Sequence, residues 1–288
     1  MTYTEFLLLN PALSVFSLIV LSLCVGSFLN VVIHRLPIML NKEWTLLSKE
    51  YLNIDEKSAT EAPYNLVTPL SSCPKCNTSI KPWHNIPVLS YLCLQGKCHT
   101  CKTPISIRYP LVEILTAFLS LIVFYKFGLT LQFFAGLVFC WVLIALTMID
   151  FDTQLLPDSM TIPLIWLGLM VNAFEVFVPL KESVFSAVGA YVFLWTFVYL
   201  FKLITGKDGM GEGDFKLFAA FGAWFGWQSL PLILVFSSFV GAIIGIIILK
   251  ISKQDSDTPL AFGPYLCIAA YLYLLYGSEL LHWYLRQF

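Results

Sequence analysis

Charged side chains are scarce in this 288-residue chain: they make up 12% of it, against about 25% in soluble domains. With a formal net charge of −1, the chain also lacks the overall basic field that holds nucleic acid. It has no G-x-x-x-x-G-K-[ST] phosphate loop. The low hydropathy and high net charge of disordered chains are absent as well. A water-soluble globule, a disordered chain and a nucleic-acid-binding protein are therefore excluded.

Apolar residues dominate instead, at 58% of the chain, and eight tryptophans suit a protein that anchors in two membrane interfaces. A membrane-spanning helix needs about 20 mostly apolar residues. Eight segments approach that length, at about 11–33, 112–128, 131–149, 160–178, 184–203, 215–227, 229–250 and 260–276. The sequence therefore predicts an all-α membrane protein with about eight transmembrane helices.

The distribution of Lys and Arg predicts the orientation of these helices. If the polar segment 35–110 is cytoplasmic, fourteen of the seventeen basic residues lie inside, and both termini lie outside. We therefore expect three parts: a first transmembrane helix at 1–34, a cytoplasmic domain at 35–110 and a membrane domain at 111–288.

Four of the eight cysteines form two Cys-x-x-Cys pairs in the cytoplasmic segment, Cys73/Cys76 and Cys98/Cys101. Two such pairs at this spacing are typical of a tetrahedral zinc site. Disulfides are disfavoured in a reducing compartment, and no βαβ pattern supports a redox pair. We expect structural zinc, which would supply folding energy to a domain short of apolar residues. Of the others, the cysteines within spans are interpreted as packing residues, and Cys93 has no assignment.

Acidic residues cluster where two spans meet the cytoplasm. Asp150 ends the third span, and Asp214 opens the sixth within Gly211–Asp214 (GEGD). Charged groups at such positions are often functional, and two adjoining carboxylates can share a proton and activate water. Asp158 is interpreted as a helix N-cap. From the residues alone, a paired-acid enzyme and a proton-coupled transporter stay equally open.

The two aspartates differ in their expected position on their helices. Asp150 lies at a helix C-terminus, where the dipole presents partial negative charge, and Asp214 lies at an N-terminus, with Lys216 nearby in sequence. This difference predicts that Asp150 holds a shared proton and that Asp214 is ionised.

Several segments, in this order and spacing, resemble the type IV prepilin peptidases, which are GxGD-type intramembrane aspartic proteases. The resemblance covers nearly the whole chain. Besides the cysteine pairs and GEGD, it rests on six segments: Gly26–Pro37 (GSFLNVVIHRLP), Asn85–Leu92 (NIPVLSYL), Gly96–Cys98 (GKC), Ile107–Glu113 (IRYPLVE), Ile149–Asp158 (IDFDTQLLPD) and Phe262–Pro264 (FGP).

The resemblance implies two reactions at the bacterial inner membrane. Members cleave the basic leader of prepilins and type II secretion pseudopilins after a Gly, and then methylate the new N-terminal residue with S-adenosylmethionine. It implies Asp150 and Asp214 as the catalytic pair, and it attributes methyl transfer to the cytoplasmic domain, with Gly96 in the matching region. The expected partners are these substrates and membrane lipid. The alternative function is a proton-coupled transporter with a zinc-stabilised cytoplasmic domain.

Overall fold

The computed structural model describes residues 10–54, 63–207, 209–252 and 261–286. Within these ranges the regular structure is helical, and the strand-like pairings are two isolated bridges, Ser72 with Ser79 and Lys97 with Pro104. The all-helical prediction is confirmed. The chain divides into two compact units, residues 1–125 and 126–288.

The first unit contains two long helices, α2 (Pro11–Tyr51) and α4 (Arg108–Phe127). Helix α2 continues past the charged end of its apolar run, so the polar segment begins inside a helix. The two helices approach closely at Gly26, where a Cβ would lie 2.7 Å from the Cα of Glu113. Nearby, Asn30 donates from Nδ2 to the Tyr109 carbonyl at 3.0 Å.

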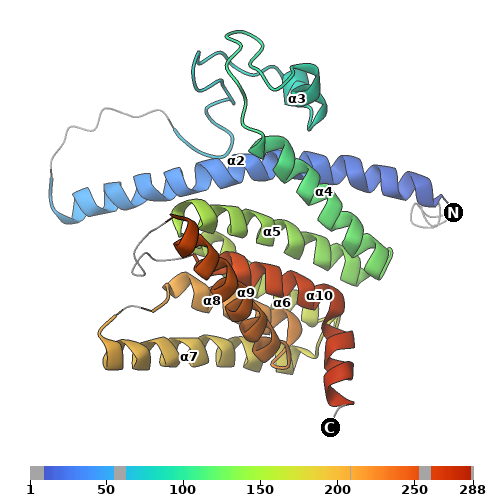
Figure 1. Cartoon of the computed structure of the whole chain (residues 1–288), viewed down its shortest axis with the longest axis vertical. Helices are drawn as coiled ribbons and strands as arrows, with labels where there is room; N and C mark the ends of the chain where they lie inside the picture. Colours follow the sequence, from blue (N-terminus) through green and yellow to red (C-terminus); the bar gives the residue numbers. More distant parts are fainter. Residues whose placement is uncertain (1–9, 55–62, 208, 253–260, 287–288) are drawn as a thin grey trace. The chain divides into compact units, whose positions relative to one another are not determined.

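Between α2 and α4 lies a segment with little regular structure, which we call the inserted domain (residues 63–107 of the described chain). It contains the short helices η1 (Pro82–Asn85) and α3 (Leu89–Cys93), drawn in teal in Figure 1. This domain also carries both Cys-x-x-Cys pairs.

The second unit is a helical assembly around α8, in which every residue from Leu217 to Phe225 is buried (Figure 1). Helix α8 packs against α6, α7, α9 and α10, and α10 also packs against α5. The elements of this unit are α5 (Leu131–Thr153), α6 (Asp158–Asn172), α7 (Leu180–Thr205), α8 (Glu212–Phe225), α9 (Ser229–Ser252) and α10 (Gly263–Leu285).

Glycines let the neighbouring helices approach α8. A Cβ on Gly168 of α6 would lie 2.5 Å from the Trp224 ring, and one on Gly222 would lie 2.6 Å from the Ser186 carbonyl oxygen of α7. Phe139 of α5 fills the same core, with its ring centroid 4.7 Å from that of Trp224. The close packing fixes α8, and with it the residues at its N-terminus.

The far end of α8 is capped by a buried amide. Asn172 donates from Nδ2 to the carbonyls of Ala223 and Trp224 at 2.8 and 3.0 Å. These carbonyls are among the last of the helix, which have no partner within it. The following Gly226 has φ of 76°, a left-handed conformation that ends the helix. Helix α8 therefore ends after 14 residues.

Six helices in the described residues are long and apolar enough to cross a membrane, so the chain is a multi-pass membrane protein. They are α2, α4, α5, α7, α9 and α10. The predicted spans at about 160–178 and 215–227 correspond to α6 and α8, with 15 and 14 residues. At 1.5 Å per residue these two helices are about 21–23 Å long, shorter than the hydrocarbon core of about 30 Å.

Candidate active site and metal centre

Asp150 is buried near the C-terminal end of α5, with 4% of its surface exposed. Three residues later the helix ends, because Gln154 adopts a left-handed conformation with φ of 54°. The backbone amide of Gly263, the first residue of α10, faces the Asp150 carboxylate. Asp150 therefore lies between the C-terminus of its own helix and the N-terminus of another.

Asp214 is buried in the first turn of α8, with 7% of its surface exposed. Its carboxylate reaches back to the backbone amide of Gly211, the N-cap residue. This is the carboxylate half of a capping box, in which the third residue of a helix satisfies an amide before the first turn. The N-terminus of α8 thus fixes the orientation of Asp214.

The two aspartates lie close enough together that their charges repel each other when both are ionised. Oδ2 of Asp150 and Oδ1 of Asp214 are both buried and accept no hydrogen bond from any residue that the structure describes. Buried polar atoms nearly always have partners in folded proteins. Two such oxygens in adjoining acids can share a proton and bind a polar group of a substrate or a water molecule.

Leu156 joins the segments that carry the two acids. A Cβ on Gly213, next to Asp214, would lie 2.7 Å from the Cβ of Leu156, and a Cβ on Gly263 would lie 3.1 Å from its Cδ1. One leucine thus contacts both glycines, each of which adjoins a carboxylate. Neither Leu156 nor Gly263 was expected at the site, although both lie in motifs that carried the family resemblance.

The prediction that Asp158 is the N-cap of α6 is wrong. It is the first helical residue, after Pro157, and both of its carboxylate oxygens lie 2.7 Å from Nζ of Lys216. The other two acids of these segments, Asp152 and Glu212, are exposed.

These contacts change the dipole argument for the shared proton. Lys216 is directed to Asp158, and Asp150 faces the N-terminal end of α10 as well as the C-terminal end of α5. Both carboxylates therefore meet amides at a helix N-terminus. The two helix dipoles at Asp150 act in opposite directions, so the difference between the acids is smaller than the sequence had predicted.

The four cysteines of the inserted domain converge on one point. The Sγ atoms of Cys73, Cys76, Cys98 and Cys101 all lie within 4.8 Å of one another. Those of Cys73 and Cys101 are 3.7 Å apart. Four thiolates around a zinc ion at about 2.3 Å would be about 3.8 Å apart, so the residues fit a tetrahedral metal.

The two cysteine turns have the same local structure. The amide of Cys73 donates to the Thr78 carbonyl at 3.0 Å, and that of Cys98 donates to the Thr103 carbonyl at 2.8 Å. Each turn then contains one residue of positive φ, Asn77 in the first and Lys102 in the second. Each pair thus folds as a self-contained knuckle that aims two sulfurs to one side.

A threonine supports one sulfur in each knuckle. The hydroxyls of Thr78 and Thr103 lie 3.3 Å from the Sγ atoms of Cys76 and Cys101. The hydroxyl and the backbone amide of Thr103 lower the pKa of the Cys101 thiol to about 6. A lowered pKa favours the thiolate, which is the form that binds metal. The repeated C-x-x-C-x-T spacing in the sequence is the signal for these threonines.

Two further features of the inserted domain bear on the predicted methyl-transfer region. Gly96 has φ of 66°, and a Cβ there would lie 2.9 Å from the Tyr91 hydroxyl oxygen. Tyr91 thus covers the backbone of Gly96. The rings of His84 and His99 stack with centroids 4.7 Å apart, beside the second knuckle. Cys93 is exposed.

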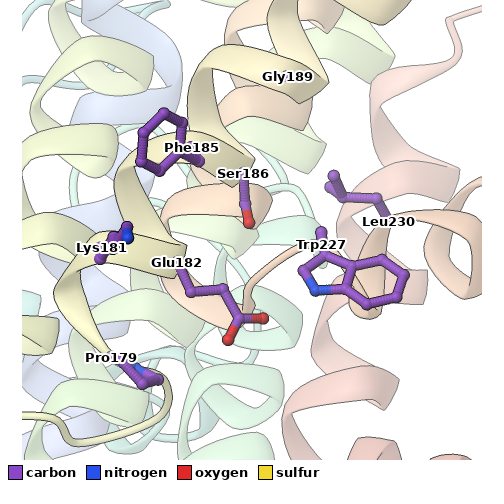
Figure 2. A pocket seen from close by; sticks show the side chains of 8 residues that line it. All are labelled: Pro179, Lys181, Glu182, Phe185, Ser186, Gly189, Trp227 and Leu230. Atoms are coloured by element: carbon purple, nitrogen blue, oxygen red, sulfur yellow. The ribbon is translucent and has the colours of Figure 1, made fainter.

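A pocket of about 610 Å³ lies in the second unit (Figure 2). Its walls come from the first turns of α7, including Phe185, and from Trp227 and Leu230 after the end of α8. Asp214 is at the opposite end of α8. The pocket is thus separate from the acid pair.

Together these features describe a multi-pass membrane protein with a paired-acid site and a separate four-cysteine module. The model of the bacterial peptidase A24 N-terminal domain matches residues 20–127, and that of the type IV leader peptidase family matches residues 137–246. The chain belongs to the type IV leader peptidase family.

Relatives named prepilin leader peptidase/N-methyltransferase match nearly the whole chain. The protein of Stutzerimonas stutzeri is 50% identical over 286 residues, covering 99% of both chains. That of Pseudomonas aeruginosa is 50% identical, covering 99% of this chain and 98% of the relative. That of Legionella pneumophila is 50% identical over 264 residues, or 92% of each chain. No solved structure matches the chain.

Proposed function

We propose that this protein processes prepilins in two steps, as an aspartic endopeptidase and then as an N-methyltransferase. The names of its relatives give this pair of activities. The observation that carries the peptidase assignment is the adjoining pair Asp150 and Asp214, each buried with one carboxylate oxygen unpaired among the described residues.

Peptide cleavage by such a pair needs one shared proton. The protonated carboxyl group donates a hydrogen bond to the scissile carbonyl, and the ionised carboxylate takes a proton from water. The resulting hydroxide attacks the carbonyl carbon. When the C–N bond breaks, the leaving nitrogen receives a proton, and the products are a carboxyl group and a free amine.

The substrates we propose are prepilins and type II secretion pseudopilins, cleaved after the glycine that ends the basic leader. Such a substrate has a polar leader followed by an apolar helix, so its scissile bond lies at the membrane boundary. Non-helical backbone is tolerated at that depth only where protein or a water-lined cavity covers it. The ends of α5 and α8, where the acids lie, suit this position.

The second step transfers a methyl group to the new amine, with S-adenosylmethionine as the donor. The amine must be uncharged when its lone pair attacks the methyl carbon; the S–CH₃ bond breaks, and the amine loses a proton. We assign this step to the inserted domain. The covered backbone of Gly96 beside Tyr91 is the candidate part of the donor site.

We further propose that Cys73, Cys76, Cys98 and Cys101 hold a structural zinc ion. Four protein ligands leave no open position for catalysis. The ion would fix both knuckles and, with them, the segment between residues 77 and 97.

The membrane topology we propose has eight spans in the bacterial inner membrane. The termini lie outside. The cytoplasmic domain (35–110), which contains the inserted domain, lies between the first span (1–34) and the membrane domain (111–288). The bias of Lys and Arg supports this orientation. In it, α6 and α8 are short spans packed within longer ones.

The direct test is to incubate the purified protein with a synthetic prepilin and follow its mass. We expect a truncated product without S-adenosylmethionine, and with the donor a further gain of one methyl group. An intact substrate would overturn the assignment. The alternative, a proton-coupled transporter, finds no support in the named relatives and would leave the peptide uncleaved.

A further inference from the structure

The inserted domain is tied to its flanking helices at two points. At the first, Arg35 of α2 donates from Nη1 to the Asn65 carbonyl at 2.9 Å and from Nη2 to the Pro69 carbonyl at 2.7 Å. At the second, Oε2 of Glu113 in α4 accepts a hydrogen bond from the backbone amide of Val88 at 2.8 Å. Both charged side chains belong to buried residues, so both ties are fixed parts of the fold.

The two ties lie at different depths along the apolar helices. Arg35 directly follows the first apolar run, whereas Glu113 lies against Gly26, nine residues nearer the middle of that run. Nine residues of helix correspond to about 13 Å. Measured along α4, Glu113 is five residues, or about 7 Å, past Arg108. Val88 is therefore held on the apolar side of Arg35 and Arg108, at the level where the apolar runs of α2 and α4 meet the membrane interface.

Large apolar side chains surround this deeper tie. Helix α3 begins directly after Val88, and its Leu89 and Leu92 are 62% and 64% exposed. Ile86 and Trp83 just before it are also exposed. In Figure 1, α3 lies level with the middle of α2 and not beyond its C-terminal end. Exposed leucines at this level of a membrane protein would face lipid.

The backbone at Val88 directs the chain into this position. Val88 has φ of 58°, and the Leu89 amide lies 2.5 Å from the Pro87 carbonyl oxygen, which defines a classic γ-turn. A β-branched residue rarely adopts this conformation, and such strain persists only where the surroundings enforce it. The buried carboxylate of Glu113 is the group that holds this turn.

The charge of the domain favours the surface of an anionic leaflet. Residues 63–107 contain four basic residues and no acidic residue. One of them, Lys81, lies with Nζ 5.4 Å from the centre of the Trp83 ring, next to the exposed apolar side chains. Basic residues beside exposed aromatic and aliphatic side chains are typical of segments that lie in a membrane interface.

We propose that residues 83–93 lie in the membrane interface on the side of the inserted domain, with the side chains of Leu89 and Leu92 reaching the acyl chains and Lys81 at anionic head groups. The inserted domain is then held against the bilayer and does not extend freely from α2.

Photolabelling by lipid tests this placement directly and does not depend on enzyme activity. The full protein is placed in nanodiscs with a phospholipid that carries a diazirine on its acyl chain, and labelled peptides are mapped by mass spectrometry. We expect label on the peptide that contains Leu89 and Leu92. The control is the peptide with Val67 and Leu70, which are 76% and 75% exposed but belong to the loop tied at Arg35. Equal label on both peptides, or none on the first, would overturn the proposal.

A matched pair of variants tests the role of the apolar side chains. Leu92→Asp should lower the labelling of the peptide that contains Leu89 and Leu92 about tenfold. Leu70→Asp should leave the labelling of this same peptide unchanged. The acidic side chain is strongly disfavoured only where it enters lipid. Equal effects of both variants would contradict a specific contact of Leu92. If Leu92→Asp does not fold, the contrast between the two wild-type peptides decides the question.

The head-group contact is tested by changing the lipid. Raising the anionic fraction of the nanodisc should increase the label on the Leu89 peptide, and Lys81→Gln should reduce this increase. Labelling that does not respond to lipid charge would contradict the contact with anionic head groups.

Discussion

Gly263 lies so close to Asp150 that a Cβ on the glycine would be 2.5 Å from Oδ2 of the aspartate. The two residues are 113 positions apart in the sequence and lie inside one compact unit. The same imagined Cβ would also lie 3.1 Å from Cδ1 of Leu156, which in turn touches Gly213 beside Asp214. The start of α10 is therefore shaped around the acid pair, and a side chain at position 263 would displace one of its members.

Gly263→Ala should impair cleavage for this reason. Forcing a methyl group into packed surroundings typically causes about 1–3 kcal/mol of strain, equivalent to roughly a five- to 150-fold effect if it acts on the site. Gly189→Ala in α7 is the matched control, because nothing lies within 4 Å of its Cβ position. Prepilin cleavage rates of both variants, at equal folded protein, provide the measurement. Equal activities would show that Asp150 tolerates the methyl group.

Asp150→Asn and Asp214→Asn should each abolish measurable cleavage. Asparagine keeps the shape of the side chain but cannot exchange the proton that the pair shares, and such proton transfers contribute roughly 100- to 10,000-fold. Asp152→Asn is the control, since Asp152 is an exposed neighbour. Mass spectrometry of the prepilin product separates these outcomes. Substantial cleavage by either of the first two variants would assign the chemistry to other residues.

Asp158→Asn should retain most of the cleavage activity. Its partner is Lys216, and the two side chains are 56% and 22% exposed, so the ion pair is worth only about 0–1 kcal/mol. Lys216→Gln, and the variant that combines it with Asp158→Asn, should behave like Asp158→Asn alone, with cleavage rates within about fivefold of wild type. A much larger loss in Asp158→Asn than in Lys216→Gln would show that Asp158 acts in the reaction itself.

Local patterns in the sequence predicted the parts of the site that each depend on one short segment. A Cys-x-x-Cys turn folds within about eight residues, so its spacing alone indicated that each pair aims two sulfurs at one point. Similarly, the end of one apolar run and the start of another placed Asp150 and Asp214 at helix ends, where the structure has them.

The contacts between segments were not predictable in the same way. That Leu156 touches both Gly213 and Gly263 depends on how α5, α8 and α10 pack, and a contact between distant residues leaves no periodic signal in one sequence. Asp158 was wrongly interpreted as an N-cap because its partner Lys216 is 58 positions away. The hydrophobic pattern likewise gave no sign that Asn172 of α6 donates to the last carbonyls of α8. That contact is made where α8 ends, after 14 residues.

The four cysteines of the inserted domain should bind zinc. Zinc content should be one ion per chain in reduced protein, and Cys73→Ser or Cys101→Ser should remove it and impair methylation. Metal analysis of the purified protein is the measurement. Protein without zinc, prepared under reducing conditions, would refute the assignment.

Acid should release the metal, because thiolates bind it and thiols do not. The contacts with Thr103 lower the pKa of the metal-free Cys101 thiol to about 6, so protons compete with zinc for this sulfur less than they do for an ordinary cysteine. Thr103→Val removes the hydroxyl that lies 3.3 Å from the sulfur, and it should therefore raise the pKa and shift the midpoint of zinc release to higher pH. Thr100→Val, at an exposed position within the same knuckle, should leave the midpoint unchanged. Zinc release followed with a chromogenic chelator across a pH series gives both midpoints, and coincident midpoints would mean that the Thr103 hydroxyl does not stabilise the thiolate.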